Sequence, residues 1–298
     1  MQTSCEFPVA INLHCKTIDK KVLKWAWEAG LFESPAELER CRLQKINWFA
    51  SYLFPEQDQA NLELITKFFL CLFLLDDLLD ILIDKTMVVF LEGLKTGNPS
   101  YNNIRLQSLG RNLLLQHQDI QKEYDFLGGS EQWNKAWLEY LAALQWEIQT
   151  KIDNSPPTLE KYRLYRPKTS GVYLAILLIR QGKDMHSCIS ELLECSIARY
   201  ICLSNDLASY RKELAIGDTH NEILILMESM GNTAVSWTQS EVKELRKSIL
   251  RLTEQLCTNF GTCDVWLRRL LLLAGGCEAW TAKTFRYQAH INGDLGRK

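Results

Sequence analysis

The chain has 298 residues, of which 47% are hydrophobic, and this is enough for one large domain with a sizeable core. Its 34 basic and 36 acidic side chains nearly cancel, which argues against the broad basic surface that nucleic-acid-binding proteins need. The 10 cysteines include no CxxC pair, and the chain is too long to need disulfide staples, so we expect free thiols in a reducing compartment.

The N-terminal segment lacks the basic start and the long apolar run of a signal peptide. No window reaches about 18 uninterrupted apolar residues, so we expect no membrane insertion and a cytoplasmic protein. Cys188, Cys195 and Cys202 recur every seven residues. This spacing predicts that they lie on one helix face as small core residues.

Apolar residues repeat at helical spacing through most of the chain, and alternating strand patterns are scarce. The first clear helix begins at Ser34, where Pro35 suits the first turn and Glu37 completes a capping box. We expect this helix to continue to about Phe54. In the first half of the chain, further helices are expected at about 59–82, 104–126 and 131–152.

In the second half, the sequence predicts a short helix that breaks between Arg166 and Pro167. Thr238 is the expected cap of a later helix, with Glu241 completing its capping box. The other helices are expected at about 187–214, 238–259 and 264–290. Because the loops are short and there is no internal repeat, the prediction is one all-α domain over 1–298, with 1–30 weakly assigned.

Three carboxylates, Asp76, Asp77 and Asp80, terminate a strongly apolar helix. Asp76 and Asp80 are four residues apart and stack on one face, whereas Asp77 points about 100° away. Like charges at this spacing destabilise a helix unless a cation joins them. Mg²⁺ takes carboxylate oxygens and shares them with phosphate, so the motif indicates a metal site, with a solvated helix end as the alternative.

A second polar cluster contains Asn205, Ser209 and Glu213 at positions i, i+4 and i+8. Each four-residue step overshoots one turn by about 40°, so the three oxygens face the same way. An amide, a hydroxyl and a carboxylate suit a hard cation, and Lys212 can reach a phosphate as a point charge. The alternative is an amphipathic helix in water, but the largely apolar residues 188–203 before it favour the mouth of a cavity.

Together the two clusters resemble the DDxxD and NDxxSxxxE metal motifs of class I terpene synthases, in the order typical of that family. The resemblance covers about residues 40–290. It implies an all-α, single-domain helical bundle around a central active-site cavity, and an isoprenyl diphosphate as substrate. It also implies three Mg²⁺ ions, with Mn²⁺ as a substitute, held by Asp76, Asp77, Asp80, Asn205, Ser209 and Glu213.

The segment 162–171 is similar to the family segment that carries a diphosphate-sensing arginine. Arg166 aligns with this sensor, and Arg163 is the alternative. In the family, the helix breaks after the sensor, beside the reacting carbon. The residues that this comparison places at the break are Thr169, Ser170 and Gly171.

Near the C-terminus, Arg286 and Tyr287 resemble the family's RY pair, which hydrogen-bonds the diphosphate. Arginine suits this role because its rigid fork of donors matches phosphate geometry. The resemblance therefore implies that four residues neutralise the diphosphate so that it can leave. They are Arg166, Lys212, Arg286 and Tyr287.

Aromatic faces stabilise a passing carbocation through their quadrupole. Phe69 and Phe73 share the helix face of Asp76, and Trp280 is the C-terminal candidate; ordinary core packing is the alternative for each.

A chain-elongating prenyltransferase needs a second DDxxD and a class II cyclase needs DxDD, and neither motif is present. A non-catalytic helical binding protein is the alternative from another class. The sequence leaves open farnesyl or geranylgeranyl diphosphate as substrate, and also a homodimer.

Overall fold

The computed structural model describes residues 6–98, 103–126, 130–180, 188–260 and 265–287. Within these ranges all regular structure is helical and no strand occurs, so the all-α prediction is confirmed. The contacts divide the chain into two compact units, which are described separately below. One comprises 1–10 and 156–298, and the other comprises 11–155. The assignment of 1–298 to a single domain stays a prediction.

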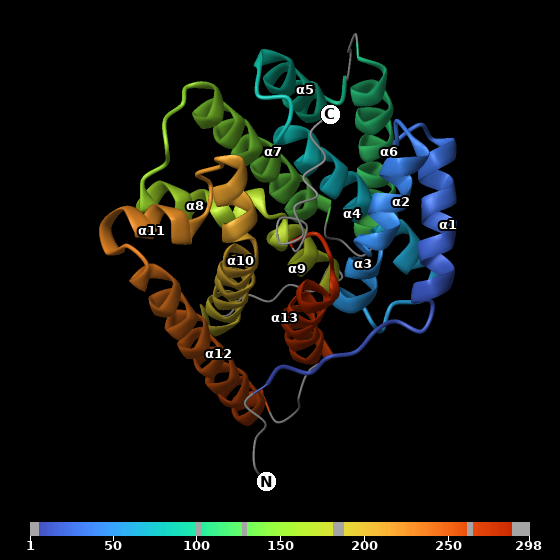
Figure 1. Ribbon diagram of the computed structural model, residues 1–298. Coiled ribbons are helices and arrows are strands. Elements are labelled where there is room, and N and C mark those ends of the chain that lie inside the picture. Colours follow the sequence, from blue (N-terminus) through green and yellow to red (C-terminus); the bar gives the residue numbers. More distant parts are fainter. Residues whose placement is uncertain (1–5, 99–102, 127–129, 181–187, 261–264, 288–298) are drawn as a thin grey trace. The chain divides into compact units, whose positions relative to one another are not determined.

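The unit 11–155 is built around α4, a long and mostly buried helix that packs against α1, α3 and α6, while α7 packs against α5 and α6 (Figure 1). The N-terminus of α4 is capped by Asp58, whose carboxylate accepts a hydrogen bond from the Asn61 N–H at 2.9 Å. The helices of this unit are α1 (Cys15–Glu28), α2 (Pro35–Leu43), α3 (Trp48–Leu53), α4 (Gln59–Leu79), α5 (Lys85–Thr96), α6 (Ile104–Phe126) and α7 (Ser130–Ile152).

The helix expected from Ser34 to Phe54 is wrong as a single element, although its start is correct. The Ser34 hydroxyl accepts from the Glu37 N–H at 3.2 Å and caps α2. The chain leaves the helix at Lys45, which has a φ of 53°, and turns into α3. Local propensity favours a continuous helix here, and this left-handed residue overrides it.

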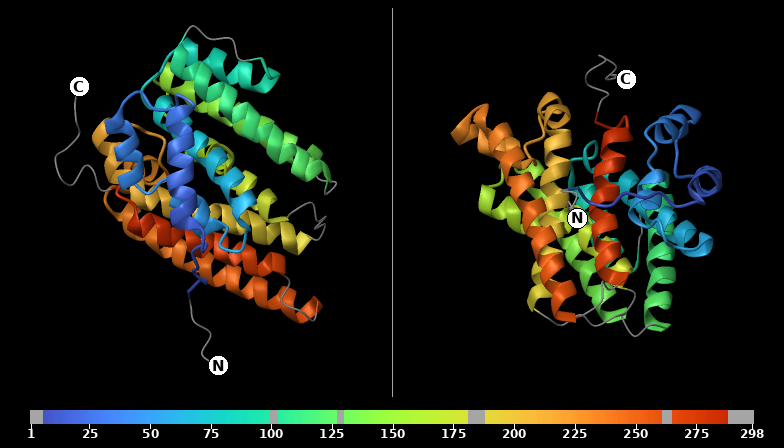
Figure 2. Two further views of the ribbon diagram at one scale, coloured as in Figure 1. Left: turned by 90° about the vertical axis from the view of Figure 1, so that its right-hand side faces the viewer. Right: turned by 90° about the horizontal axis from the view of Figure 1, so that it is seen from below.

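In the other unit, α10 is the central helix and lies against both α12 and α13 (Figures 1 and 2). Most residues of α10 from Leu193 to Leu203 are buried, so the polar residues that follow emerge from a packed segment. The helices of this unit are α8 (Leu159–Thr169), α9 (Val172–Arg180), α10 (Cys188–Ile216), α11 (Glu222–Met230), α12 (Thr233–Phe260) and α13 (Val265–Lys283).

Two local predictions for this unit are wrong. Pro167 lies inside α8, because the Ser170 N–H still bonds to the Arg166 carbonyl at 3.0 Å. The helix ends at Thr169, with Ser170 as the C-cap, just before Gly171, whose φ is 69°. Thr238 is not a cap: α12 has already begun at Thr233, and Thr238 is fully buried inside it. A capping pattern within a longer helix cannot be distinguished from a true start by sequence alone.

The described cysteines are free thiols, as expected. Cys202 is buried, but Cys188 and Cys195 are exposed, so the prediction that all three are core residues is wrong.

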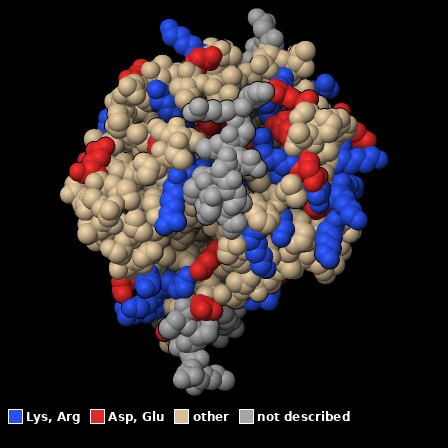
Figure 3. Space-filling model, in the orientation of Figure 1, with Lys and Arg blue, Asp and Glu red and all other residues tan. Residues whose placement is uncertain are grey.

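Acidic and basic side chains are interspersed over the face drawn in Figure 3. Among the helices that the structure describes, none has the length and apolar character required to cross a membrane.

Candidate functional site

The aspartate cluster lies at the C-terminal end of α4. Asp76 and Asp77 are in the last turn and Asp80 is the C-cap, whose N–H bonds to the Asp76 carbonyl at 3.3 Å. Asp76 is exposed, and the other two are partly buried. Carboxylates at the C-terminal end of a helix interact unfavourably with the negative pole of its dipole, and these three also repel one another. Local stability therefore does not explain the cluster, whereas a cation would.

One buried lysine from α7 partly neutralises this corner. Lys151 Nζ lies 3.2 Å from both Asp80 Oδ1 and Glu147 Oε1, and its side chain is only 8% exposed. Burial raises the pKa of Tyr140 well above its usual range, and the charges of Asp76 and Glu147 add to the effect. The corner therefore gathers several carboxylates beside this lysine, and a divalent cation there would reduce their mutual repulsion.

No three His, Cys, Asp or Glu side chains in the described part of the chain form a ready-made metal cage. Mg²⁺ typically uses one or two carboxylates and completes its shell with water and substrate phosphate. The exposed Asp76 and the partly buried Asp77 and Asp80 fit that kind of incomplete, shared site.

The second predicted ligand set lies on α10, where Asn205, Ser209 and Glu213 follow one another along one face. Ser209 is buried, and its hydroxyl donates to the Asn205 carbonyl at 3.0 Å. Burial, with the nearby charge of Asp206, raises the pKa of Glu213 to about 8, although hydrogen bonds from Asn221 and Ser209 oppose the rise. A divalent cation would relieve this cost, so the oxygen donor set fits a metal.

Arg166, on α8, contacts this set directly. Its Nε donates to Asp206 Oδ1 at 2.9 Å, and its Nη2 donates to Asn205 Oδ1 at 2.8 Å. Burial disfavours the charged form, but the carboxylate of Asp206 outweighs it and raises the pKa of Arg166 well above its usual range. The site therefore holds a permanently charged guanidinium beside the predicted metal ligands.

Arg163, the alternative sensor, belongs to a different network. Its guanidinium donates to Glu222 Oε1 at 2.9 and 2.6 Å and lies 5.9 Å from the centre of the Trp237 ring. Glu222 is fully buried and is also bonded by Arg199. Burial would raise the pKa of Glu222, but the hydrogen bonds from Arg199 and Arg163 lower it. Arg163 thus balances the buried charge of Glu222, whereas Arg166 bonds to Asp206 and Asn205.

Asp206 organises the site and was not singled out from the sequence. It is 1% exposed, and its Oδ2 accepts from the Tyr162 hydroxyl at 2.8 Å and from the Glu222 N–H at 3.2 Å. Since Oδ1 is bonded to Arg166, both oxygens are used. Its position within the second motif was the available signal, although one residue corresponds to about 100° of helix and so separates it from the face of Asn205.

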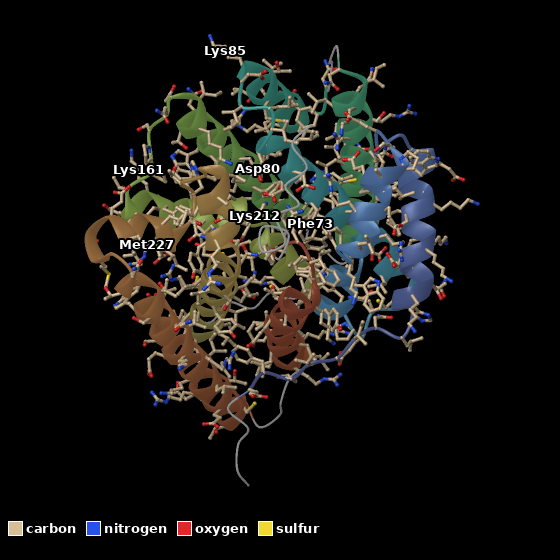
Figure 4. All side chains as sticks on the ribbon, viewed as in Figure 1. Phe73, Asp80, Lys85, Lys161, Lys212 and Met227 are labelled. Atoms are coloured by element: carbon tan, nitrogen blue, oxygen red, sulfur yellow. The ribbon has the colours of Figure 1, made fainter. Side chains whose placement is uncertain are left out.

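The C-terminal pair reaches the same helix. Tyr287 Oη accepts a hydrogen bond from Asn205 Nδ2 at 2.8 Å, so both ends of the Asn205 amide are bonded. Arg286 is buried, and its N–H donates to Thr284 Oγ1 at 3.1 Å. The structure therefore brings Arg166, Asn205 and Tyr287 together, as the sequence motifs predict for this unit. Lys212, beside Glu213 on α10, is partly buried and is labelled in Figure 4.

The predicted helix break adjoins Arg166. Thr169 Oγ1 donates to the Arg166 carbonyl at 3.2 Å, and Ser170 Oγ donates to the Pro167 carbonyl at 3.1 Å. Gly171 then reverses the backbone between α8 and α9. Only a residue without a Cβ adopts its φ of 69° readily, so the break is built into the sequence at this position.

The aromatic candidates all lie in packed surroundings. Phe69 and Phe73 contact the ring of Phe49 edge-on, at centroid distances of 5.5 and 5.1 Å. Phe73 is partly exposed, whereas Phe69 is buried. Trp280 is 1% exposed and meets the ring of Tyr287 edge-on at 6.2 Å. Of the three candidates, Phe73 lies about one turn before the aspartates of α4, and Trp280 lies beside Tyr287.

Residues 67–248 match the family model described as terpene synthase family 2, C-terminal metal binding. The chain belongs to this terpene synthase family. The matched segment includes both predicted metal motifs and Arg166. As a terpene synthase the chain is a lyase, and its family implies a divalent metal and a prenyl diphosphate substrate.

Curated relatives are terpene synthases of low sequence identity. This terpene synthase is 23% identical to the 4-epi-cubebol synthase ((2E,6E)-farnesyl diphosphate cyclizing) of Streptosporangium roseum, over 83% of this chain and 78% of that protein. It is 25% identical to the (+)-T-muurolol synthase ((2E,6E)-farnesyl diphosphate cyclizing) of Roseiflexus castenholzii, over 74% and 71% of the two chains.

Solved structures show the fold. The linalool/nerolidol synthase of Streptomyces clavuligerus superposes with a TM-score of 0.77 at 17% identity, covering 92% of this terpene synthase and 98% of that chain. A single-substitution variant of cucumene synthase gives a TM-score of 0.76 at 22% identity, over 96% and 100% of the two chains. The predicted class I terpene synthase fold is therefore confirmed.

Proposed function

We propose that this terpene synthase is a Mg²⁺-dependent cyclase that ionises a linear isoprenyl diphosphate, closes the carbocation to a ring product and releases diphosphate. The observation that carries the proposal is the pair of hydrogen bonds on Asn205. Arg166 and Tyr287, which come from distant parts of the sequence, both bond to this one residue of the second metal motif. Such convergence fits a site for an anion together with its cations.

Two ligand sets are proposed for the metal ions. Bound Mg²⁺ would supply charge neutralisation of the leaving diphosphate. One set would consist of Asp76, Asp77 and Asp80, and the other of Asn205, Ser209 and Glu213.

The cationic and donor side chains would bind the diphosphate itself. Arg166 suits the sensor role because it is buried, charged and bonded to Asn205, whereas Arg163 is engaged by Glu222. Lys212, Arg286 and Tyr287 would add further charge and donors. Fixed donors aimed at an oxygen that gains charge lower the barrier to bond cleavage, because they need little reorganisation.

Farnesyl diphosphate is the proposed substrate. The two curated relatives described above carry farnesyl diphosphate in their names, and their similarity spans most of this chain. Packed aromatic residues, with Phe69, Phe73 and Trp280 as the candidates, would exclude water from the cation and stabilise it through ring faces. Geranylgeranyl diphosphate is the competing substrate.

The test uses the purified full-length chain with geranyl, farnesyl and geranylgeranyl diphosphates, with and without Mg²⁺. Diphosphate release and the volatile products are measured. We expect Mg²⁺-dependent release with farnesyl diphosphate, its loss in Asp76→Ala and Asn205→Ala, and its retention in Asp119→Ala, which removes a surface carboxylate paired with Lys122. Absence of release with all three substrates, or undiminished release in both motif variants, contradicts the proposal.

A further inference from the structure

Asn221 lies outside both metal motifs, yet it is fully buried beside the second one. It is the N-cap of α11, and its Oδ1 accepts from the Ile223 N–H at 2.9 Å. Figure 4 labels Lys212 on α10 and Met227 on α11, the two helices that are joined at this point. Because the oxygen of Asn221 faces its own helix, the amide nitrogen is available for α10.

That nitrogen bonds to the metal motif. Nδ2 of Asn221 donates to Glu213 Oε2 at 2.6 Å and to the Asp206 carbonyl at 2.9 Å, and it lies 3.4 Å from Ser209 Oγ. Two of the three proposed α10 ligands are therefore in contact with one side chain. A hydrogen bond to a carboxylate is among the stronger ones, and it restricts the rotamer of Glu213.

The backbone around Asn221 is fixed on both sides. Gly217, with a φ of 77°, ends α10, and the Asp218 carboxylate accepts from the His220 N–H at 2.8 Å. The His220 carbonyl lies 3.2 Å from the Tyr162 hydroxyl, which also donates to Asp206. The position of Asn221 is thus linked through Tyr162 to Asp206, the residue that holds Arg166, and these contacts keep its amide against α10.

We propose that Asn221 is a positioning residue that holds the side chains of Glu213 and Ser209 in the orientation in which they bind a divalent cation. It would act only through these ligands and not contact the metal or the substrate. The inference rests on the proposed function, which assigns Ser209 and Glu213 as ligands. Residues that orient metal ligands typically change metal affinity by about 10- to 100-fold when they are replaced.

The decisive variant is Asn221→Asp. Aspartate keeps the size and the oxygen that caps α11, but it places an acceptor where Nδ2 donates to Glu213. The matched control is Ser34→Ala, which removes the cap of α2 and contacts no motif residue. We expect Asn221→Asp to raise the Mg²⁺ concentration for half-maximal diphosphate release by about 10- to 100-fold while helical circular dichroism is retained. Ser34→Ala should lower Tm and leave the Mg²⁺ requirement unchanged.

A second readout does not depend on turnover: the increase in Tm that Mg²⁺ and inorganic diphosphate produce should be smaller in Asn221→Asp than in the wild type. If Asn221→Asp does not fold, Asn221→Ser is used, because serine retains a capping oxygen and cannot reach Glu213 as the amide does. An unchanged Mg²⁺ requirement with a lowered Tm shows that Asn221 is only a cap and overturns the inference. A wild-type chain without Mg²⁺-dependent release instead contradicts the proposed function.

Discussion

Arg166 donates a hydrogen bond from its guanidinium to the side-chain oxygen of Asn205, at 2.8 Å. The oxygen proposed to bind a metal is therefore bonded to the residue proposed to bind the diphosphate. If Arg166 bound a diphosphate, the Asn205 oxygen would be released for the metal. The hydrogen bond from Arg166 Nε to Asp206 would keep the guanidinium in place. The two ligands should consequently bind more tightly together than separately, because each removes a competing contact of the other.

The first prediction separates the two candidate sensors. Arg166→Ala should lower kcat/KM for diphosphate release on the order of 10²-fold or more, because a donor to the leaving group is lost. Arg163→Ala should mainly lower Tm, because it leaves the buried Glu222 with one partner fewer. Steady-state kinetics and thermal unfolding of both variants provide the check. Equal losses of kcat/KM at the two positions would contradict the assignment of Arg166.

The second prediction concerns the aromatic residues. Phe73→Leu and Trp280→Leu keep an apolar side chain and remove the ring quadrupole that stabilises a cation. We expect the ratio of terpene products to change several-fold while the rate of diphosphate release falls less, since ionisation depends on the polar groups. Gas chromatography of the products beside a diphosphate assay tests this. A product profile identical to that of the wild type would assign both residues to packing alone.

The sequence predicted the parts of the site that obey helical spacing. Asn205, Ser209 and Glu213 lie on one helix because a four-residue period is a local property. The role of Asp206 depends on Tyr162, Arg166 and the Glu222 backbone, which are 16 to 44 positions away, and no periodicity reports such contacts. The same holds for the fold. The long helices were predicted, but the shorter helices α1, α5 and α11 were not, and the end of α8 depended on how the backbone turns after Ser170.

The third prediction tests the close approach of the N-terminal segment to α13. A Cβ at Gly275 would lie 2.2 Å from the Pro8 carbonyl oxygen, a backbone atom that cannot rotate away. In an open helix, Gly→Ala stabilises by up to about 1 kcal/mol. Here we expect Gly275→Ala to lower the free energy of unfolding by about 1–3 kcal/mol, because residues 7 and 8 must move.

A double-mutant cycle with Phe7→Ala gives the control for Gly275. Phe7 is buried and contacts the Tyr200 ring edge-on at 5.0 Å. If the clash displaces this segment, then Gly275→Ala should cost less in the Phe7→Ala background, and the two effects should not add. A Tm raised by Gly275→Ala alone would show that the segment does not pack against α13.

The fourth prediction is a pH dependence of stability that arises from His117. Its ring lies 4.7 Å from the ring of Trp137 and stacks on Trp133 at 5.9 Å, and burial lowers its pKa to about 4. The unfolded chain, with a histidine pKa near 6.5, binds the proton more readily, so stability should fall as the pH decreases from about 6.5 to about 4. The difference between the two pKa values corresponds to a loss of roughly 3 kcal/mol in the free energy of unfolding at the acid end of this range.

Urea unfolding of the wild type and of His117→Phe across this pH range isolates the contribution of His117 to stability, because phenylalanine keeps the aromatic contacts without a titrating group. Parallel stability curves for the two proteins would show that the ring is already solvated in the folded state.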